Sequence, residues 1–113
     1  MRFAEFDDEE LLTVVKPLAE HTENSWNQKS YEDFCLYLSD QFPEEEFNRQ
    51  LEDSYDEFGI HTITDLVAIH RNPENVIVIW QVDFEKRKEP GLLMYCFIER
   101  EGKALIGGCT YHA

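Results

Sequence analysis

The pattern of apolar positions is clearest in residues 76–84, which read Val-Ile-Val-Ile-Trp-Gln-Val-Asp-Phe. β-Branched and aromatic residues dominate this stretch, and its nine residues are an ordinary strand length. Every even position is apolar, whereas the odd positions change from Ile77 and Ile79 to Gln81 and Asp83. This alternation predicts a strand in the middle of a sheet, with one face in a core and half of the other face also needing cover.

The first helix is expected to begin at Asp7 or Asp8, because either side chain can accept a hydrogen bond from the free amides of a first turn. Pro17 lies inside the apolar pattern and predicts a kink or a restart, because it lacks the amide that would bond the preceding turn. The polar residues 21–25 predict a loop that carries Trp26. The apolar stripe of this helix consists of Leu11, Leu12, Val15, Leu18 and Ala19.

Two further helices are expected before residue 60. Ser30 followed by Asp33 resembles a capping box, and apolar residues at helical spacing continue from there to Phe42. Pro43 ends this helix and can begin the next one, which Gly59 ends as a C-cap. The buried stripes are Tyr31, Phe34, Cys35, Leu38 and Phe42 in the second helix and Phe47, Leu51, Tyr55 and Phe58 in the third.

After Gly59 the apolar period changes from 3.6 to 2, which predicts strands. The connections between consecutive strands are short, so neighbouring strands should be antiparallel. Gly107 and Gly108 predict a bulge that bends the last strand. The sequence therefore predicts an α+β fold with three N-terminal helices packed on a curved four-stranded antiparallel meander. The expected strands are Thr62–Arg71, Val76–Phe84, Leu92–Glu99 and Ala104–His112.

A helical half that ends in Gly59, the stretch VIVIWQVDF and the later stretch YCFIEREGKALIGG together resemble the nuclear transport factor 2-like superfamily. Its members have the cystatin-like α+β cone, and the resemblance covers roughly residues 8 to 112. It implies a curved sheet against helices, a cavity between them, and frequent homodimers through the outer sheet face. Members include isomerases, dehydratases, cyclases, transport factors and dimerisation modules, so the resemblance does not imply one activity.

Length and charge narrow the classes of function. The 113 residues predict one domain spanning 1–113, and a net charge of −14 repels phosphate, so binding to nucleic acid or to an anionic membrane is not expected. Cys35, Cys96 and Cys109 lack Cys-x-x-Cys spacing, which indicates reduced thiols and a cytoplasmic protein. Asp7 and Asp8 interrupt the N-terminus before a signal-peptide segment, and no apolar run reaches the ~18 residues of a membrane helix.

Six residues are candidates for lining a small apolar ligand pocket, because they combine apolar bodies with polar atoms. The alternative is that they only pack the core. His70 is included because it shares a strand face with Leu66 and Ala68. The candidates are Trp26, Tyr31, Tyr55, His70, Trp80 and Tyr95.

No catalytic, cofactor or metal site is expected. Asp83 is the obvious general-base candidate, but alternation with Val82 and Phe84 places it outside the cone. His61 and His112 lie near element ends and are expected to be solvated, and the histidines lack metal-ligand spacing.

The preferred hypothesis is a cytoplasmic, non-enzymatic homodimeric binding module with a small apolar cavity, whose dimer interface includes Ile77, Ile79 and Gln81. One alternative is an enzyme resembling the SnoaL-type isomerases and dehydratases, acting on a small hydrophobic substrate. A second alternative is an acidic immunity or decoy protein that binds a basic partner. Its acidic surface would consist of Glu44, Glu45, Glu46, Glu52, Asp53, Asp56 and Glu57.

Overall fold

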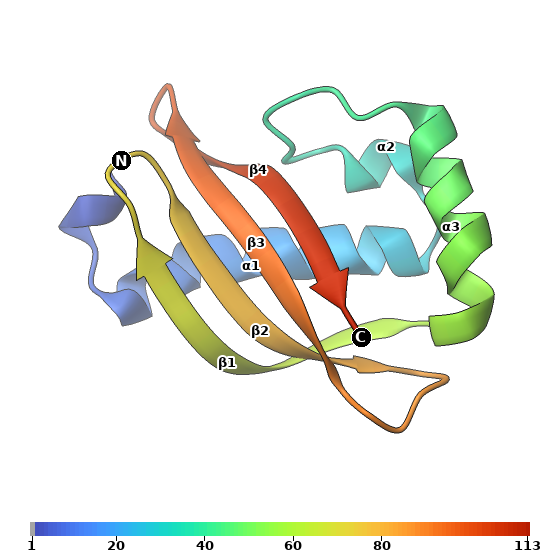
Figure 1. The fold of residues 1–113 in the computed structure, drawn as a ribbon. Coiled ribbons are helices and arrows are strands. Elements are labelled where there is room, and N and C mark those ends of the chain that lie inside the picture. Colours follow the sequence, from blue (N-terminus) through green and yellow to red (C-terminus); the bar gives the residue numbers. More distant parts are fainter. Residues whose placement is uncertain (1) are drawn as a thin grey trace.

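A four-stranded antiparallel sheet with one long helix against it forms most of the structure, a computed structural model that describes residues 2–113 (Figure 1). The strands follow one another in the order β1-β2-β3-β4, so each pairs with its sequence neighbour. The expected fold class is confirmed. The elements are η1 (Phe3–Glu5), α1 (Asp8–Asn27), α2 (Tyr31–Phe34), α3 (Glu44–Phe58), β1 (His61–Arg71), β2 (Val76–Phe84), β3 (Gly91–Arg100) and β4 (Lys103–His112).

β2 is a central strand with the predicted bounds, and it pairs with β1 on one side and β3 on the other. Its even positions are all buried, whereas Ile77, Ile79 and Gln81 are half-buried and Asp83 is exposed. The sheet departs from regular pairing where expected: Gly107 is an extra residue opposite the Cys96–Phe97 step and forms the bulge in β4. The alternation of apolar and polar residues in 76–84 therefore predicted correctly which side chains of β2 face the core.

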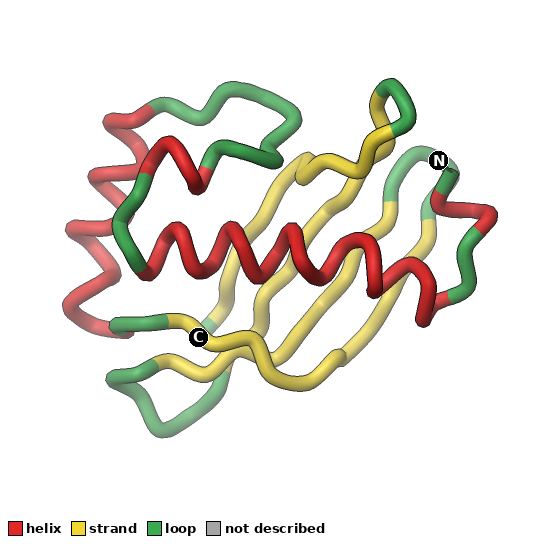
Figure 2. The backbone as a smooth tube through the Cα atoms, turned by 180° about the vertical axis from the view of Figure 1, so that it is seen from behind, coloured by secondary structure: helices red, strands yellow, loops and turns green. Residues whose placement is uncertain are grey.

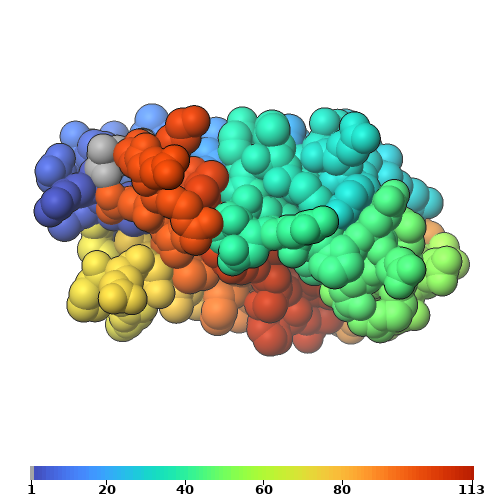
Figure 3. Space-filling model, turned by 90° about the horizontal axis from the view of Figure 1, so that it is seen from above, coloured from blue at the N-terminus to red at the C-terminus, as the bar shows by residue number. Residues whose placement is uncertain are grey.

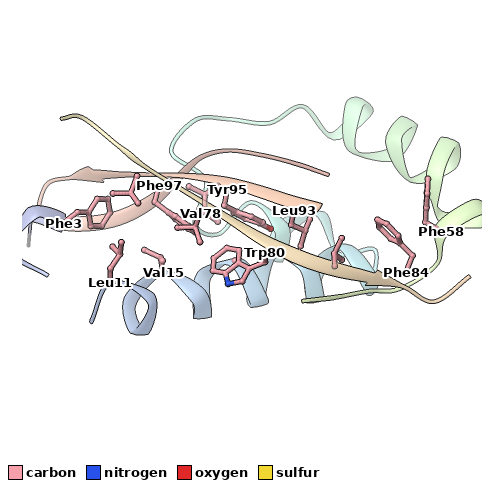
Figure 4. Close-up of a cluster of buried hydrophobic side chains, with 14 residues drawn as sticks. Phe3, Leu11, Val15, Phe58, Val78, Trp80, Phe84, Leu93, Tyr95 and Phe97 are labelled. Carbon is pink, nitrogen blue, oxygen red and sulfur yellow. The ribbon is translucent and has the colours of Figure 1, made fainter. Parts of the chain in front are cut away.

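α1 covers the inner face of the sheet and crosses the strands, as the view from behind shows (Figure 2). Its side chains meet those of β2 and β3 in a continuous apolar layer, part of which is drawn in Figure 4. We call this layer the sheet core. Its buried members are Phe3, Leu11, Val15, Ala19, Phe58, Val76, Val78, Trp80, Val82, Phe84, Leu93, Tyr95, Phe97 and Ile106.

α1 is longer than expected, because it continues through Pro17 and through residues 21–25, which were expected to form a loop. Pro17 lies on the exposed side of the helix, where water can satisfy the carbonyl group that its missing amide leaves free. Beyond it, the hydroxyl of Ser25 donates to the carbonyl of His21 at 2.8 Å. The helix also begins as expected, with a complete capping box between Asp7 and Glu10. None of the helices in residues 2–113 is long and apolar enough to cross a membrane.

The second helix is shorter than expected, because α2 ends at Phe34 instead of continuing to Phe42. The chain leaves the helix to pair with the edge of the sheet. The amide of Ser39 donates to the carbonyl of Ile106, and the amide of Ile106 donates to the carbonyl of Tyr37, both at 2.8 Å. Hydrogen bonds to an open strand edge thus replace those of the predicted helix.

α3 begins within one residue of the expected start and ends at Gly59, whose φ of 71° is a conformation that glycine adopts without strain. The helix stands at one end of the sheet, beyond β4 (Figure 1). A second group of buried residues lies beneath it, which we call the aromatic cluster. It consists of Trp26, Phe34 and Phe47, with Tyr31, Cys35, Leu38, Phe42, Leu51 and Cys109 packed around them.

Candidate functional site

A pocket of about 250 Å³ opens between the C-terminal half of α1, α3 and the end of β4. Seen from above in Figure 3, α3 (green) and the segment after α2 (teal) lie beside β4 (red). The wall combines the aromatic rings of Trp26, Phe34 and Tyr111 with polar side chains, and Glu23 is its one acidic residue among the described residues. Its lining residues are Glu23, Trp26, Phe34, Gln50, Leu93, Cys109, Thr110 and Tyr111.

Glu23 is the unusual member of this wall, because its carboxylate is buried and has two side-chain donors. The hydroxyl of Tyr95 donates to its Oε2, and Nδ1 of His61 donates to its Oε1 at 2.8 Å. The three residues come from α1, β3 and β1, so they meet only in the folded chain. Glu23 is 7% exposed and His61 4%, so this is a buried polar network, and Glu23 is its member in the wall of the pocket.

His61 is held in place by the C-terminal end of α1. The side chain of Asn27 accepts a hydrogen bond from the backbone amide of His61 at 2.9 Å and donates to its carbonyl at 2.8 Å. The imidazole ring packs between aromatic rings, with centroid distances of 5.1 Å to Phe84, 5.2 Å to Tyr111 and 6.1 Å to Trp26. His61 therefore has a fixed position, which fixes the carboxylate that it contacts.

The network holds its neighbouring acidic groups in their neutral forms. Burial, together with the negative charge of Glu23, raises the pKa of the Tyr95 hydroxyl well above its usual value of 10.0. The same two causes raise the pKa of the Cys109 thiol to about 12, although the hydrogen bond with Tyr95 acts in the opposite direction. Cys109 is therefore a thiol rather than a reactive thiolate at neutral pH.

What the site can bind depends chiefly on the carboxylate of Glu23. A carboxylate has about four lone-pair positions, and Tyr95 and His61 occupy two of them. The remaining positions can accept a hydrogen bond from a bound molecule, pair with a cation, or receive a proton. Trp26 adds one more polar atom, because its indole N–H is buried without an acceptor among the described residues.

Comparison with known proteins bears on the fold. No family model and no curated protein sequence matches the chain. Among solved structures, a nuclear transport factor 2-like protein of unknown function from Shewanella oneidensis MR-1 is similar over 86% of this chain and 94% of its own, with a TM-score of 0.58 and 12% identity. A variant of Rd1NTF2_05 matches over 87% of this chain and 96% of its own, with a TM-score of 0.60 and 14% identity.

The fold is nuclear transport factor 2-like.

Within this nuclear transport factor 2-like fold, the expected ligand residues are spread over several regions. Trp26 lines the pocket, and Tyr95 lies behind it and reaches it through Glu23. Trp80 does not line the pocket. Its ring is buried in the sheet core, against Tyr95 and Phe97. The even-numbered face of β2 is filled by contacts with α1 and is closed to a ligand.

The other three expected ligand residues lie away from the pocket. The hydroxyl of Tyr31 donates to the carbonyl of Phe42, which fixes the segment after α2. The hydroxyl of Tyr55 donates to the carbonyl of Asn27 at 3.1 Å. His70 is exposed opposite Ile77 on the outer sheet face, because its neighbour Ile69, opposite Val78, takes the inner position.

Sequence reasoning missed Glu23 and misplaced His61. His61 was expected to be solvated because it stands at the end of a strand, but the end of α1 and its aromatic neighbours enclose it. A signal for Glu23 exists, because Leu11, Val15 and Ala19 are buried four residues apart and Glu23 continues that spacing. A charged residue on the buried stripe of a helix indicates a buried polar site.

The remaining expectations concern the surface. Asp83 is exposed as expected, and no group of three metal-ligating side chains occurs within residues 2–113. The acids of the decoy hypothesis lie on α3, where Arg49 pairs with Glu46 and, at 3.2 Å, with Asp53. Binding of a basic partner to that helix stays a prediction.

Proposed function

We propose that the protein binds a small, largely apolar molecule in the pocket beside Glu23. The observation that carries this proposal is a buried glutamate, Glu23, in the wall of a pocket that aromatic side chains also line. Ligand sites commonly combine apolar and aromatic walls with a few fixed polar groups. Glu23 is such a group, because hydrogen bonds from Tyr95 and His61 fix its carboxylate.

Two energetic considerations support a binding role. Burying a carboxylate is costly even when it is hydrogen-bonded, so an interior selected only for stability would favour an apolar residue here. A ligand in the pocket, which measures about 250 Å³ and opens to solvent, would also remove apolar surface of the aromatic wall from water, which favours binding. Because a cavity of about 150 Å³ holds benzene, this pocket has room for roughly ten non-hydrogen atoms.

A titration with cyclohexylmethanol tests the proposal. We expect the NMR signal of the Trp26 indole N–H to move on binding, because Trp26 lines the pocket. The signal of Trp80, which lies in the sheet core, should stay in place. Cys109→Met places a larger side chain in the pocket wall and should weaken binding about tenfold or more. Cys96→Met, on the outer face, is the matched control.

The proposal fails if neither cyclohexylmethanol nor its amine and carboxylate counterparts moves the Trp26 signal. It also fails if Cys109→Met and Cys96→Met weaken binding equally, because the alcohol would then bind somewhere other than the pocket.

A second candidate function is homodimerisation through the outer sheet face, and we propose Ile77, Ile79 and Gln81 as part of that interface. In Figure 1 the sheet lies in front of α1 and no helix covers its near side. In the sheet, Ile79 lies opposite Met94 and Gln81 lies opposite Leu92. Met94 is 36% exposed and Leu92 is 41% exposed. A continuous apolar face of this kind is uncommon on a monomer, and two copies related by a twofold axis can cover it.

Analytical ultracentrifugation at micromolar concentration tests the dimer. We expect a dimer that Ile79→Lys converts to a monomer, because the substitution buries an unpaired charge in the interface. Thr13→Lys, at an exposed position of α1 on the opposite side of the sheet, is the matched control and should leave the dimer intact. A wild-type monomer would rule this candidate out and would leave the ligand pocket unaffected.

A further inference from the structure

Among the described residues, the wall of the pocket contains an acidic side chain but no basic one. Glu23 is the only acidic side chain in its wall within residues 2–113, and no Lys or Arg side chain lines it. A bound anion would face this carboxylate without a counter-charge in a poorly solvated site, which costs free energy. The chain as a whole also carries a net charge of −14, so its field draws cations towards it and repels anions.

Two neighbours of Glu23, Tyr95 and Cys109, bring no positive charge to the site. Tyr95 donates from a neutral hydroxyl whose pKa is raised, and the Cys109 thiol is neutral for the same reason. A neutral imidazole with its proton on Nδ1 is enough for the bond from His61. Two lone-pair positions of the carboxylate remain for a ligand, and the strongest partner for them is a charged donor.

The aromatic part of the wall also suits a cation. Trp26, Phe34 and Tyr111 line the same pocket as Glu23, and aromatic faces attract ammonium groups, with Trp the most effective. Elsewhere the chain uses such contacts for its own cations: Nζ of Lys29 lies 4.2 Å from the Tyr55 ring centroid. Within the described chain no Lys or Arg side chain lies over a pocket ring.

We propose that the pocket binds a small organic amine as its protonated ammonium form, with the nitrogen at Glu23 and the hydrocarbon part against Trp26 and Phe34. This inference rests on the proposed function, because it names the class of molecule that the pocket takes. An aliphatic ammonium has a pKa near that of lysine, about 10.4, and is therefore charged at neutral pH. The volume of the pocket limits the ligand to roughly ten non-hydrogen atoms.

Three probes of nearly equal shape separate charge from size: cyclohexylmethylamine, cyclohexylmethanol and cyclohexanecarboxylate. Each is titrated into the wild-type protein at neutral pH while the indole N–H signals of Trp26 and Trp80 are followed. We expect the amine to bind about ten- to a hundredfold more tightly than the alcohol, because it adds a charge-assisted hydrogen bond and a cation–π contact. The carboxylate should not move the Trp26 signal.

Glu23→Gln removes the charge with little change of shape. We expect this variant to weaken amine binding about tenfold or more and to leave alcohol binding within about threefold. Glu52→Gln on the exposed side of α3 is the matched control and should leave the affinities for both probes unchanged. The wild-type ratio of amine to alcohol affinity needs no variant, so it tests the inference even if Glu23→Gln does not fold.

The outcomes distinguish the two proposals. If alcohol and amine bind the wild-type pocket equally well, the amine inference is overturned and the ligand pocket stands. Equal amine affinity in folded Glu23→Gln and wild type overturns the amine inference too. If none of the three probes moves the Trp26 signal, the proposed function fails and the inference fails with it.

Discussion

The sheet core and the aromatic cluster are both rich in large side chains, but they are built differently. In the sheet core, one long helix lies across the strands, the inner positions of β2 are all apolar, and Trp80, Tyr95 and Phe97 are fully buried. In the aromatic cluster, Trp26, Phe34 and Phe47 come from three separate helices. The aromatic cluster contributes Trp26 and Phe34 to the wall of the pocket with the buried carboxylate, whereas the sheet core contributes Leu93.

The difference follows from how each region is closed. A strand presents a regular row of side chains, and a helix parallel to its face can fill every gap. The aromatic cluster is closed by α2, which has four residues, and by α3, which stands beyond the edge of β4. We infer that stability is concentrated in the first region and binding in the second.

Matched Phe→Ala substitutions in the two regions test this contrast most strongly. Phe97→Ala in the sheet core should cost about 3–5 kcal/mol of unfolding free energy, because it opens a cavity in a closed layer. Phe34→Ala should cost about half as much, since one side of its ring already borders the pocket. Chemical denaturation measures both values. Equal costs would mean that the aromatic cluster is packed as tightly as the sheet core.

Tyr95 belongs to the sheet core and donates a hydrogen bond to Glu23 in the pocket wall. Substituting it therefore tests how strongly the sheet core and the pocket are coupled. Tyr95→Phe keeps the ring and removes the hydroxyl donor from Glu23. We expect a loss of about 1–3 kcal/mol, because the buried carboxylate loses one of its two side-chain donors. Amine affinity should change as well. A variant as stable as the wild type, with unchanged binding, would show that the network does not depend on this hydroxyl.

Alkaline pH should destabilise the protein through the same groups. The pKa of Cys109 rises from 9.0 to about 12 on folding, and that of Tyr95 rises above 10.0. Both groups are neutral when protonated, so the unfolded chain loses these protons at a pH where the folded chain keeps them. Their contribution to stability is complete below about pH 9 and is lost as pH rises, at up to about 1.4 kcal/mol per pH unit for each group.

Denaturation curves between about pH 9 and pH 11 check this dependence. The slope should be shallower in Tyr95→Phe and in Cys109→Ala than in the wild type. The same slope in all three proteins would show that these two groups titrate normally in the folded state.

The smallest expected difference concerns the helix starts of the two regions. Asp7 completes a capping box on α1, so Asp7→Ala should cost about 1 kcal/mol. The hydroxyl of Ser30 donates to the side chain of Asp33 and accepts no amide of α2, so Ser30→Ala should change stability by less than about 0.5 kcal/mol. Thermal unfolding of the two variants measures the difference. A larger loss for Ser30→Ala would reverse this ranking.

The strands that form the sheet core could be predicted from the sequence. Alternation in β2, the Gly59 stop and the Gly107 bulge were all predicted, because local period and glycine conformation determine them. The four strands and α3 have nearly the expected bounds, and so does the start of α1.

Most of the candidate site could not be predicted from the sequence. Residues 21–25 are polar and suggested a loop, yet they are helical because their polar atoms find partners in distant strands and in the preceding turn. The bonds between Glu23, His61 and Tyr95 join residues 38 and 72 positions apart along the chain. No local pattern records such pairings. The early end of α2 has the same kind of cause, because Leu38 pairs with Ile106 at the sheet edge.

A crystal structure of the wild-type protein with cyclohexylmethylamine would test most directly whether the aromatic cluster holds a ligand site. We predict the amine nitrogen about 3 Å from the Glu23 carboxylate and the cyclohexyl ring against Trp26 and Phe34. An amine bound only at the exposed carboxylates of α3, with the pocket beside Glu23 closed by its own side chains, would contradict the account.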